Sequence, residues 1–235
     1  MASSTSHVLQ RLIGMVRSPR ATLTEVVRHP RSLDLAVLIV AIASICSSGF
    51  LMTRVGQLAA LDQQVRQLES FGVVISDDTY EAIRSMVPYR PIVTAAVIII
   101  GWPVLWLLTA RAVQWLGRRT GHGEATFQQV LAVVVHASAI LAVRAIVAAP
   151  INYARESLGG ATSLSMIMPA FGESTFPARL FGAMDIFIVW WVVLVALGLS
   201  ILYQTRTMPI ARWLFAAYAG GAAALALTQA FRGGV

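Results

Sequence analysis

Residues 127–149 read FQQVLAVVVHASAILAVRAIVAA, and this stretch decides the class of the protein. After its first turn it carries only two ionisable side chains, His136 and Arg144. A helix of about 20 residues crosses the hydrocarbon core of a bilayer, which is about 30 Å thick. Because lipid cannot hydrogen-bond to an open strand edge, a single apolar stretch of this kind must be helical. The stretch is therefore predicted to be a membrane-spanning helix.

The composition of the whole chain agrees with this prediction. Of its 235 residues, 57% are hydrophobic and only 12% are charged, whereas a soluble domain carries about 25% charged residues. All 18 basic residues are arginine and the net charge is +7. Such a charge fits arginines at a membrane surface better than a nucleic-acid partner, so we expect membrane lipid and no nucleic acid. An alanine-rich chain without lysine also suggests a GC-rich bacterial genome.

Four further apolar stretches are long enough to cross a bilayer. The predicted fold is an all-α integral membrane protein, a bundle of five transmembrane helices with an N-terminal interfacial helix and an extracytoplasmic helical hairpin. The cytoplasmic amphipathic segment covers residues 1–32, and the membrane domain covers 33–235. The predicted spans are 33–52, 91–116, 127–149, 180–203 and 210–230, and an outer helical segment covers 53–90.

The distribution of arginines predicts the orientation, because cytoplasmic loops carry an excess of them. With the N-terminus inside, ten arginines lie on the inner side: Arg11, Arg17, Arg20, Arg28, Arg31, Arg111, Arg118, Arg119, Arg206 and Arg212. Seven lie on the outer side: Arg54, Arg66, Arg84, Arg90, Arg155, Arg179 and Arg232. We therefore expect a multi-pass protein of a bacterial inner (plasma) membrane, with a cytoplasmic N-terminus and the C-terminus outside.

The segment before the first span is amphipathic. Leu12, Ile13 and Met15 belong to a broad apolar side that Arg11 and Arg17 flank. A helix of this kind can lie in the plane of the membrane interface. It can equally pack beneath the bundle, and the sequence does not distinguish these two arrangements.

The outer segment 53–90 is predicted to be helical, with the first span continuing outward as a long helix. Asp78, with Glu81 three residues later, resembles a capping box at the start of a second helix. The segment is either a hairpin that folds on itself as a cap or an arm that binds a partner. Its apolar residues recur at three- and four-residue spacing, which is typical of a coiled-coil seam: Leu58, Leu61, Val65 and Leu68.

No catalytic or metal-binding pattern is present in the sequence. The single cysteine, Cys46, cannot form an intramolecular disulfide or a cysteine-based zinc site. A metal site needs clustered ligands, whereas the four histidines are scattered: His7, His29, His122 and His136. We therefore predict that the protein is not an enzyme, with no catalytic residues, no metal and no cofactor.

Three polar residues inside the predicted spans are the candidate functional residues: His136, Arg144 and Asp185. Arg144 and Asp185 lie at matched depth on two spans that one outer loop connects. A charge at this depth is unfavourable unless it is paired, hydrated or able to reach the interface. An ion pair that fixes helix register, a substrate or proton path, and independent snorkelling are the three alternatives.

The fifth span carries small residues at four-residue spacing: Ala216, Gly220 and Ala224. Such a face allows another helix to approach closely. The other helix can belong to the same molecule or to a second copy, so a homo-oligomer is possible.

Residues 184–211, MDIFIVWWVVLVALGLSILYQTRTMPIA, resemble the signature of the bacterial branch of the Yip family, the Ypt/Rab-interacting membrane proteins. The matching positions are Asp185, Phe187, Trp190, Gly198 and Leu199. The resemblance covers nearly the whole chain, and the spans agree in number and order. Ile188 departs from the hydroxyl residue that bacterial members often carry. Eukaryotic members are implicated in vesicle traffic and in binding small GTPases. A bacterial cell has no Golgi, so this function is not carried over to the chain as a whole.

The resemblance and the absence of catalytic patterns together predict a non-enzymatic scaffold or adaptor that organises protein partners or lipid. The alternative is a transporter or channel subunit for a small molecule, ion or lipid. A transporter requires His136, Arg144 and Asp185 to line one continuous water-filled path. A scaffold requires them to be buried and mutually satisfied.

Overall fold

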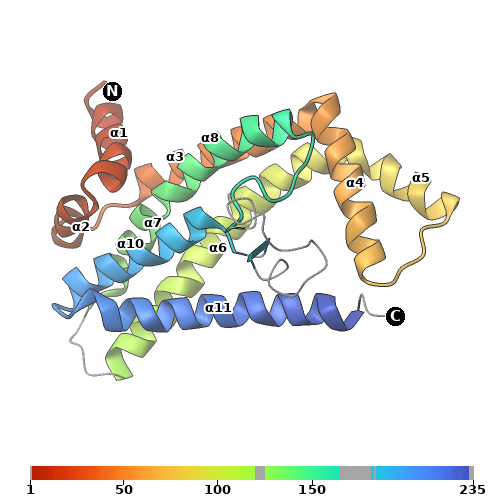
Figure 1. The fold of residues 1–235 in the computed structure, drawn as a ribbon. Helices are drawn as coiled ribbons and strands as arrows, with labels where there is room; N and C mark the ends of the chain where they lie inside the picture. Colours follow the sequence, from red (N-terminus) through yellow and green to blue (C-terminus); the bar gives the residue numbers. More distant parts are fainter. Residues whose placement is uncertain (1, 120–124, 165–180, 183, 233–235) are drawn as a thin grey trace. The chain divides into compact units, whose positions relative to one another are not determined.

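The computed structural model describes residues 2–119, 125–164, 181–182 and 184–232. In this part the regular secondary structure is helical, apart from one isolated β-bridge between Ser163 and Asp185. The helices, shown in Figure 1, are α1 (Ala2–Arg17), α2 (Pro19–Arg28), α3 (Leu33–Met52), α4 (Arg54–Ser70), α5 (Asp77–Met86), the 3-10 helix η1 (Val87–Tyr89), α6 (Arg90–Arg119), α7 (Phe127–Ala137), α8 (Ala139–Ala154), α10 (Ile186–Leu202) and α11 (Thr207–Arg232).

Three helical stretches among the described residues are long and apolar enough to cross a membrane. They are Leu33–Met52, Asp77–Trp115 and Phe127–Ala154. Ile186–Leu202 is a shorter apolar helix, and residues 180 and 183 of the predicted fourth span lie outside the described part of the chain. The predicted fifth span lies within α11. The chain is thus an all-helical, multi-pass membrane protein.

The chain divides into two compact units. The first contains Met1–Ala43, Val97–Val143 and Phe187–Ala216, and the second contains Ser44–Ala96, Arg144–Ile186 and Ala217–Val235. The helices α3, α6, α8, α10 and α11 each contribute residues to both units.

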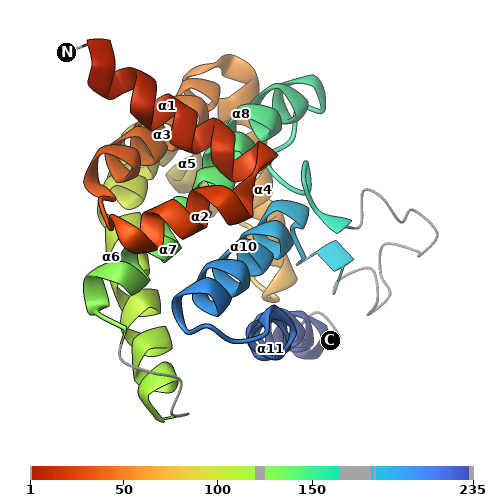
Figure 2. The same cartoon turned by 90° about the vertical axis from the view of Figure 1, so that its left-hand side faces the viewer.

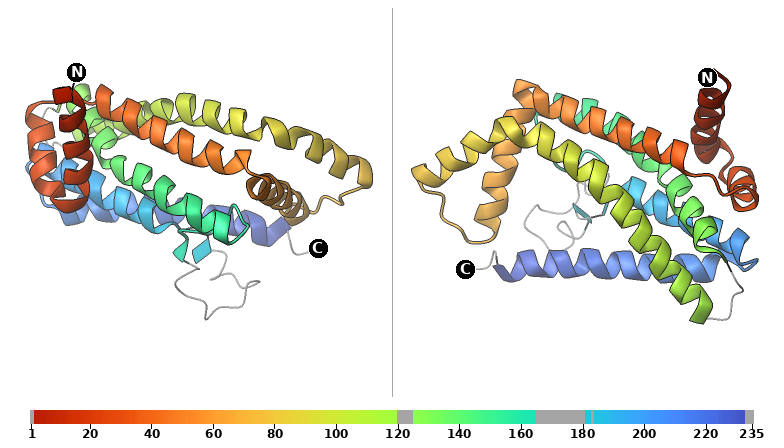
Figure 3. Two further views of the ribbon diagram at one scale, coloured as in Figure 1. Left: turned by 90° about the horizontal axis from the view of Figure 1, so that it is seen from above. Right: turned by 180° about the vertical axis from the view of Figure 1, so that it is seen from behind.

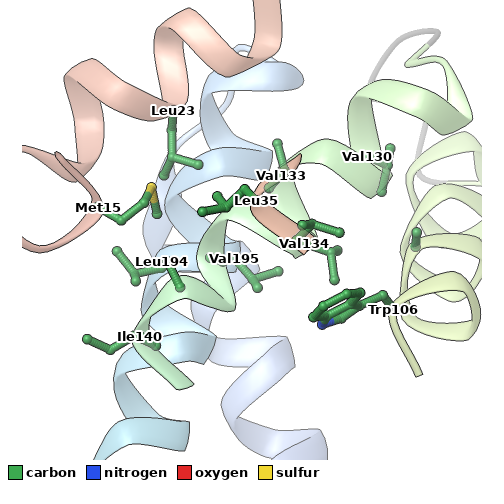
Figure 4. Packing of buried hydrophobic residues seen from close by; sticks show 14 of the residues in the cluster. Met15, Leu23, Leu35, Trp106, Val130, Val133, Val134, Ile140, Leu194 and Val195 are labelled. Carbon is green, nitrogen blue, oxygen red and sulfur yellow. The ribbon is translucent and has the colours of Figure 1, made fainter. Parts of the chain in front are cut away.

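The first unit is organised around one apolar core. Met15 of α1, Leu23 of α2 and Leu194 of α10 are almost completely buried in it, together with Val133 of α7. Figure 4 shows these four side chains gathered in the same cluster. Burying apolar side chains is the main favourable contribution to folding, so this cluster holds the N-terminal helices onto the rest of the unit.

The N-terminal segment packs on the protein, which is one of the two arrangements left open by its sequence, and its place in the membrane interface stays a prediction. Helices α1 and α2 contact each other and α7 (Figure 2), and Met15 is fully buried. Leu9 and Ile13, on another side of α1, are 46% and 48% exposed. The segment therefore packs on the protein through one side and leaves an apolar strip uncovered by the described residues.

The predicted third span differs from the observed helices at two points. It is interrupted at Ser138, between α7 and α8, where the Ser138 hydroxyl donates to the Val134 carbonyl at 2.9 Å and accepts from Trp191 Nε1 at 3.0 Å. The predicted end of this span at residue 149 is wrong, because α8 continues through Pro150 to Ala154. A proline removes one backbone hydrogen bond but does not require the helix to end, and an apolar environment favours keeping the remaining bonds.

The prediction that the first span continues outward as one long helix is also wrong. Thr53 has an extended backbone between α3 and α4, and its side chain accepts a hydrogen bond from the Gly56 backbone N–H at 3.0 Å. The Thr53 hydroxyl also donates to the Phe50 carbonyl at 2.7 Å. A Cβ at position 56 would overlap that carbonyl, so a glycine is needed for this close approach.

Within the second unit, α4 and α5 form a helical hairpin (Figure 3). Leu61, Ile83 and Val87 are buried together, and two further seam residues of α4 pack on them. Leu58, the first residue of the predicted seam, is 58% exposed. The predicted capping box is wrong by two positions, because Ser76 caps α5 by accepting from the Thr79 N–H. The hairpin thus packs against itself, as the cap interpretation expects.

Candidate functional site

An ion pair between Arg144 and Asp185, one of the three alternatives left open by the sequence, is present in the second unit. Arg144 Nε, on α8, donates to Asp185 Oδ2 at 2.6 Å. The Asp185 side chain is 12% exposed and the Arg144 side chain is 42% exposed. A charge-assisted hydrogen bond of this length is among the stronger side-chain interactions, and here it neutralises a largely buried carboxylate.

Asp185 lies immediately before α10, which corrects its predicted place within the fourth span. The chain around it is extended because it pairs with residues 162–164: the Ile186 N–H donates to the Thr162 carbonyl at 3.0 Å, and the Leu164 N–H donates to the Met184 carbonyl at 2.8 Å. The first of these bonds satisfies a donor that a helix start leaves open. The partial positive charge at a helix N-terminus also favours a carboxylate here.

A second side chain donates to the same carboxylate oxygen. The Thr162 hydroxyl bonds to Asp185 Oδ2, and Thr162 itself is only 7% exposed. The backbone N–H of Asp185 donates to the Tyr218 hydroxyl of α11 at 3.0 Å. Sequence reasoning missed both Thr162 and Tyr218, because each lies in a different segment from Asp185 and neither belongs to a recognisable motif. Four separate segments therefore meet at Asp185.

Arg144 also lines a cavity in the second unit. The cavity has a volume of about 300 Å³ and is lined by residues of α3, α4, α6 and α8 and by the turn at 158–162. Asp185 is not among its lining residues. Arg144 therefore contributes both to the ion pair and to the wall of the cavity.

His136, the third predicted residue, belongs to the first unit rather than the second. It is fully buried within the apolar core, and its Nδ1 lies 2.8 Å from the Ala132 carbonyl oxygen. A carbonyl can only accept, so Nδ1 carries a proton. Its Nε2 has no hydrogen-bond partner among the described residues. His136 is thus held by its own helix.

The signature positions of the fourth span each have a structural role. Phe187 and Trp190 stack with their ring centroids 6.4 Å apart and an angle of 20° between their planes. At Gly198, an added Cβ would overlap the side chain of Val133 and lie 3.3 Å from Leu23 Cδ2. The glycine therefore allows α10 to approach α7 and α2 closely, as small residues do between membrane helices.

The small-residue face of α11 is exposed. Ala216, Gly220 and Ala224 are all exposed, and no heavy atom of the described residues lies within 4 Å of a Cβ built on Gly220. Whether this face packs within the molecule or against a second copy stays a prediction. Among the described residues, no group of three or more histidine, cysteine or acidic side chains is arranged to hold a metal ion.

A comparison with protein-family sequence profiles matches residues 13–229 to the Yip1 domain. The matched range includes the whole of the ion pair, the signature positions and His136. Neither the curated proteins nor the solved structures contain a significant match to the chain.

Proposed function

Because the chain belongs to the Yip1 domain family, we propose that it is a membrane scaffold or adaptor that organises protein partners or lipid. The family consists of generally non-enzymatic membrane-trafficking proteins. The proposed role is therefore one of binding and positioning within the membrane.

The observation that carries this proposal is the enclosure of two of the three candidate polar residues, Asp185 and His136, whereas Arg144 is partly exposed and lines the cavity. Asp185 is buried, bonded to Arg144 and Thr162, and absent from the lining of the cavity. His136 is fully buried in the apolar core of the first unit. A transport path requires polar groups that water or substrate can reach. The transporter alternative therefore has less support than the scaffold.

We further propose that the protein crosses a bacterial plasma membrane five times, with its N-terminus in the cytoplasm. The spans are α3, α6, the α7–α8 pair, α10 and α11, and their apolar composition supports this assignment. The excess of arginines on one side of the predicted spans supports the orientation. The helical hairpin of α4 and α5 then lies outside the cell.

Two exposed surfaces are available for partners. One is the apolar strip of α1 that contains Leu9 and Ile13, and the other is the small-residue face of α11 around Gly220. An amphipathic helix at an inner membrane surface binds lipid, whereas a small-residue face binds another helix. We therefore assign lipid contact to α1 and contact with a protein, either a partner or a second copy, to α11.

Photo-cross-linking in native membranes tests the scaffold role. A photoreactive residue at Gly220 should give discrete protein adducts that mass spectrometry identifies, and a matched residue at Val74, which is 90% exposed in the loop of the outer hairpin, serves as the control. Equal, diffuse labelling from both positions would contradict the proposal. Uptake of a solute by liposomes containing the purified protein would support the transporter instead.

A further inference from the structure

The cavity of about 300 Å³ in the second unit carries two arginines and no compensating acid. Arg90, at the start of α6, and Arg144, on α8, both line it, and the described lining residues include no aspartate or glutamate. Arg144 is paired with Asp185, which lies beside the cavity rather than in its wall. One positive charge in excess therefore faces this space.

The arginines have unused hydrogen-bond donors. Arg144 bonds only through Nε, so its two terminal nitrogens have no partner among the described residues. The side chain of Arg90 has no hydrogen bond or ion pair with any residue that the structure describes. Both side chains are half-buried, and guanidinium groups in a partly apolar setting are costly without an acceptor.

The other polar side chains in the wall of the cavity fit an anion that also carries a hydroxyl group. Thr94 and Gln63 line the same cavity and can donate hydrogen bonds. Asn152 Oδ1 is buried with no hydrogen-bond partner in the described part of the chain. This oxygen accepts hydrogen bonds, so it needs a donor that a bare anion without protons does not supply.

The other side of the cavity is apolar. Phe50, Leu51 and Leu158 contribute to it, together with alanines of α8. The volume lies at the lower end of the range for small-molecule pockets, which is about 300–1,000 Å³. The space therefore suits a small organic anion rather than a long chain.

We propose that this cavity binds a phosphate ester of a small polyol, with Arg90 and Arg144 bonded to the phosphate and Asn152 Oδ1 accepting from a hydroxyl of the polyol. Arginine matches the geometry of a phosphate better than any other side chain because its planar group presents two parallel donors. The ester can come from a lipid headgroup, such as phosphatidylglycerol, or from a soluble metabolite, such as glycerol 3-phosphate. The site goes beyond the scaffold role and does not depend on it.

The test uses the full-length protein, delipidated in a neutral detergent. Native mass spectrometry measures retention of added phosphatidylglycerol, with phosphatidylcholine as the zwitterionic comparison, and calorimetry measures binding of glycerol 3-phosphate. Preferential retention of phosphatidylglycerol identifies the lipid source, and binding of glycerol 3-phosphate alone identifies the soluble source. The absence of binding in both arms would overturn the proposal.

Substitutions then assign the binding to this cavity. Arg90→Gln should weaken binding about tenfold or more, because it removes charge-assisted hydrogen bonds to the anion. Arg84→Gln is the matched control, since Arg84 carries the same charge in the same unit but is exposed, paired with Glu81 and absent from the cavity wall. An equal loss of binding in both variants would mean nonspecific electrostatic attraction of the anion to the protein and would overturn the proposal of a site in this cavity.

Asn152→Ala provides a second variant if Arg90→Gln fails to fold. It should weaken binding of the glycerol-bearing ligands while leaving inorganic phosphate, used as a separate probe, unaffected. Unchanged binding of every probe in Asn152→Ala would contradict the assigned pose. Failure of any of these binding tests would leave the cross-linking result for the scaffold role unchanged, so the two proposals fail separately.

Discussion

Arg144 and Asp185 are 41 residues apart in the sequence and are joined by an Nε–Oδ2 hydrogen bond of 2.6 Å. The pair ties α8 to the start of α10, and the Thr162 hydroxyl adds a second donor to the same oxygen. The carboxylate is largely buried and the guanidinium is not. Removing Arg144 and removing Asp185 should therefore change the free energy of unfolding by different amounts.

Arg144→Ala should destabilise the protein more than Asp185→Ala, because it leaves a largely buried carboxylate without its charged partner. The double substitution should cost less than the sum of the two, with a coupling free energy of about 1 kcal/mol, since the arginine is partly exposed to solvent or lipid headgroups. Denaturant unfolding in detergent measures the cycle. Strict additivity of the two changes would show that the pair contributes no stability.

Thr162→Val should lower the free energy of unfolding by about 1 kcal/mol, because it removes a buried donor and keeps the shape of the side chain. Thr162→Ser keeps the hydroxyl and is the matched control, which should retain most of the stability. Thermal unfolding of the purified protein checks both variants. If serine and valine were equally destabilising, the methyl group rather than the hydroxyl would be responsible.

Gly198→Ala should destabilise the first unit by about 1–3 kcal/mol, because the new methyl group would overlap Val133 and crowd Leu23. Gly220→Ala is the control, because it makes the same change from glycine to alanine in another helix. Position 220 has open space in the described structure, and alanine favours a helix over glycine by about 1 kcal/mol. The melting temperatures of the two variants should therefore move in opposite directions, and a shared downward shift would argue against the close approach at Gly198.

A nitroxide label at Ile13 in the full-length, reconstituted protein should be relaxed by oxygen, which concentrates in lipid. A label at Arg17, which is exposed on the same helix, should be relaxed instead by a water-soluble nickel complex. The expected contrast follows from an apolar strip that faces the membrane interface. Greater access of the nickel complex to position 13 would place this strip in water.

Met15→Ala should destabilise the first unit by about 2–5 kcal/mol, because Met15 is fully buried between the N-terminal helices and the core. Leu9→Ala, at an exposed position of the same helix, should change stability by less than about 0.5 kcal/mol. Equal effects of the two substitutions would show that α1 does not pack through Met15.

Cysteines introduced at Ser4 and Gly234, in a background where Cys46 is replaced by alanine, should respond oppositely to a membrane-impermeant thiol reagent. Ser4 should be protected in intact cells and Gly234 labelled, since an odd number of spans places the ends on opposite sides. Labelling of both positions from outside would contradict five spans with a cytoplasmic N-terminus.

Much of the secondary structure could be predicted from the sequence, because the bilayer restricts an apolar segment to a helix. The bounds of α3 agree with the predicted first span, and the Arg144–Asp185 contact follows from two unfavourable charges at matched depth. The breaks at Thr53 and Ser138 could not be predicted in the same way. At Thr53 the cap depends on the close approach of Gly56 to the Phe50 carbonyl, and at Ser138 the hydroxyl bonds to Trp191, whose position is set by packing.

Hydropathy and charge distribution by themselves determine that this chain is helical, multi-pass and apolar, because transfer from water to lipid depends on composition and not on neighbours. Only the tertiary structure decides that Asp185 precedes α10 and that Thr162 and Tyr218 bond to it. It also decides that Arg90 and Arg144 line one cavity, whereas His136 belongs to another unit. These contacts join segments that are far apart in the sequence, and they form only where packing brings matched donors and acceptors within hydrogen-bond distance.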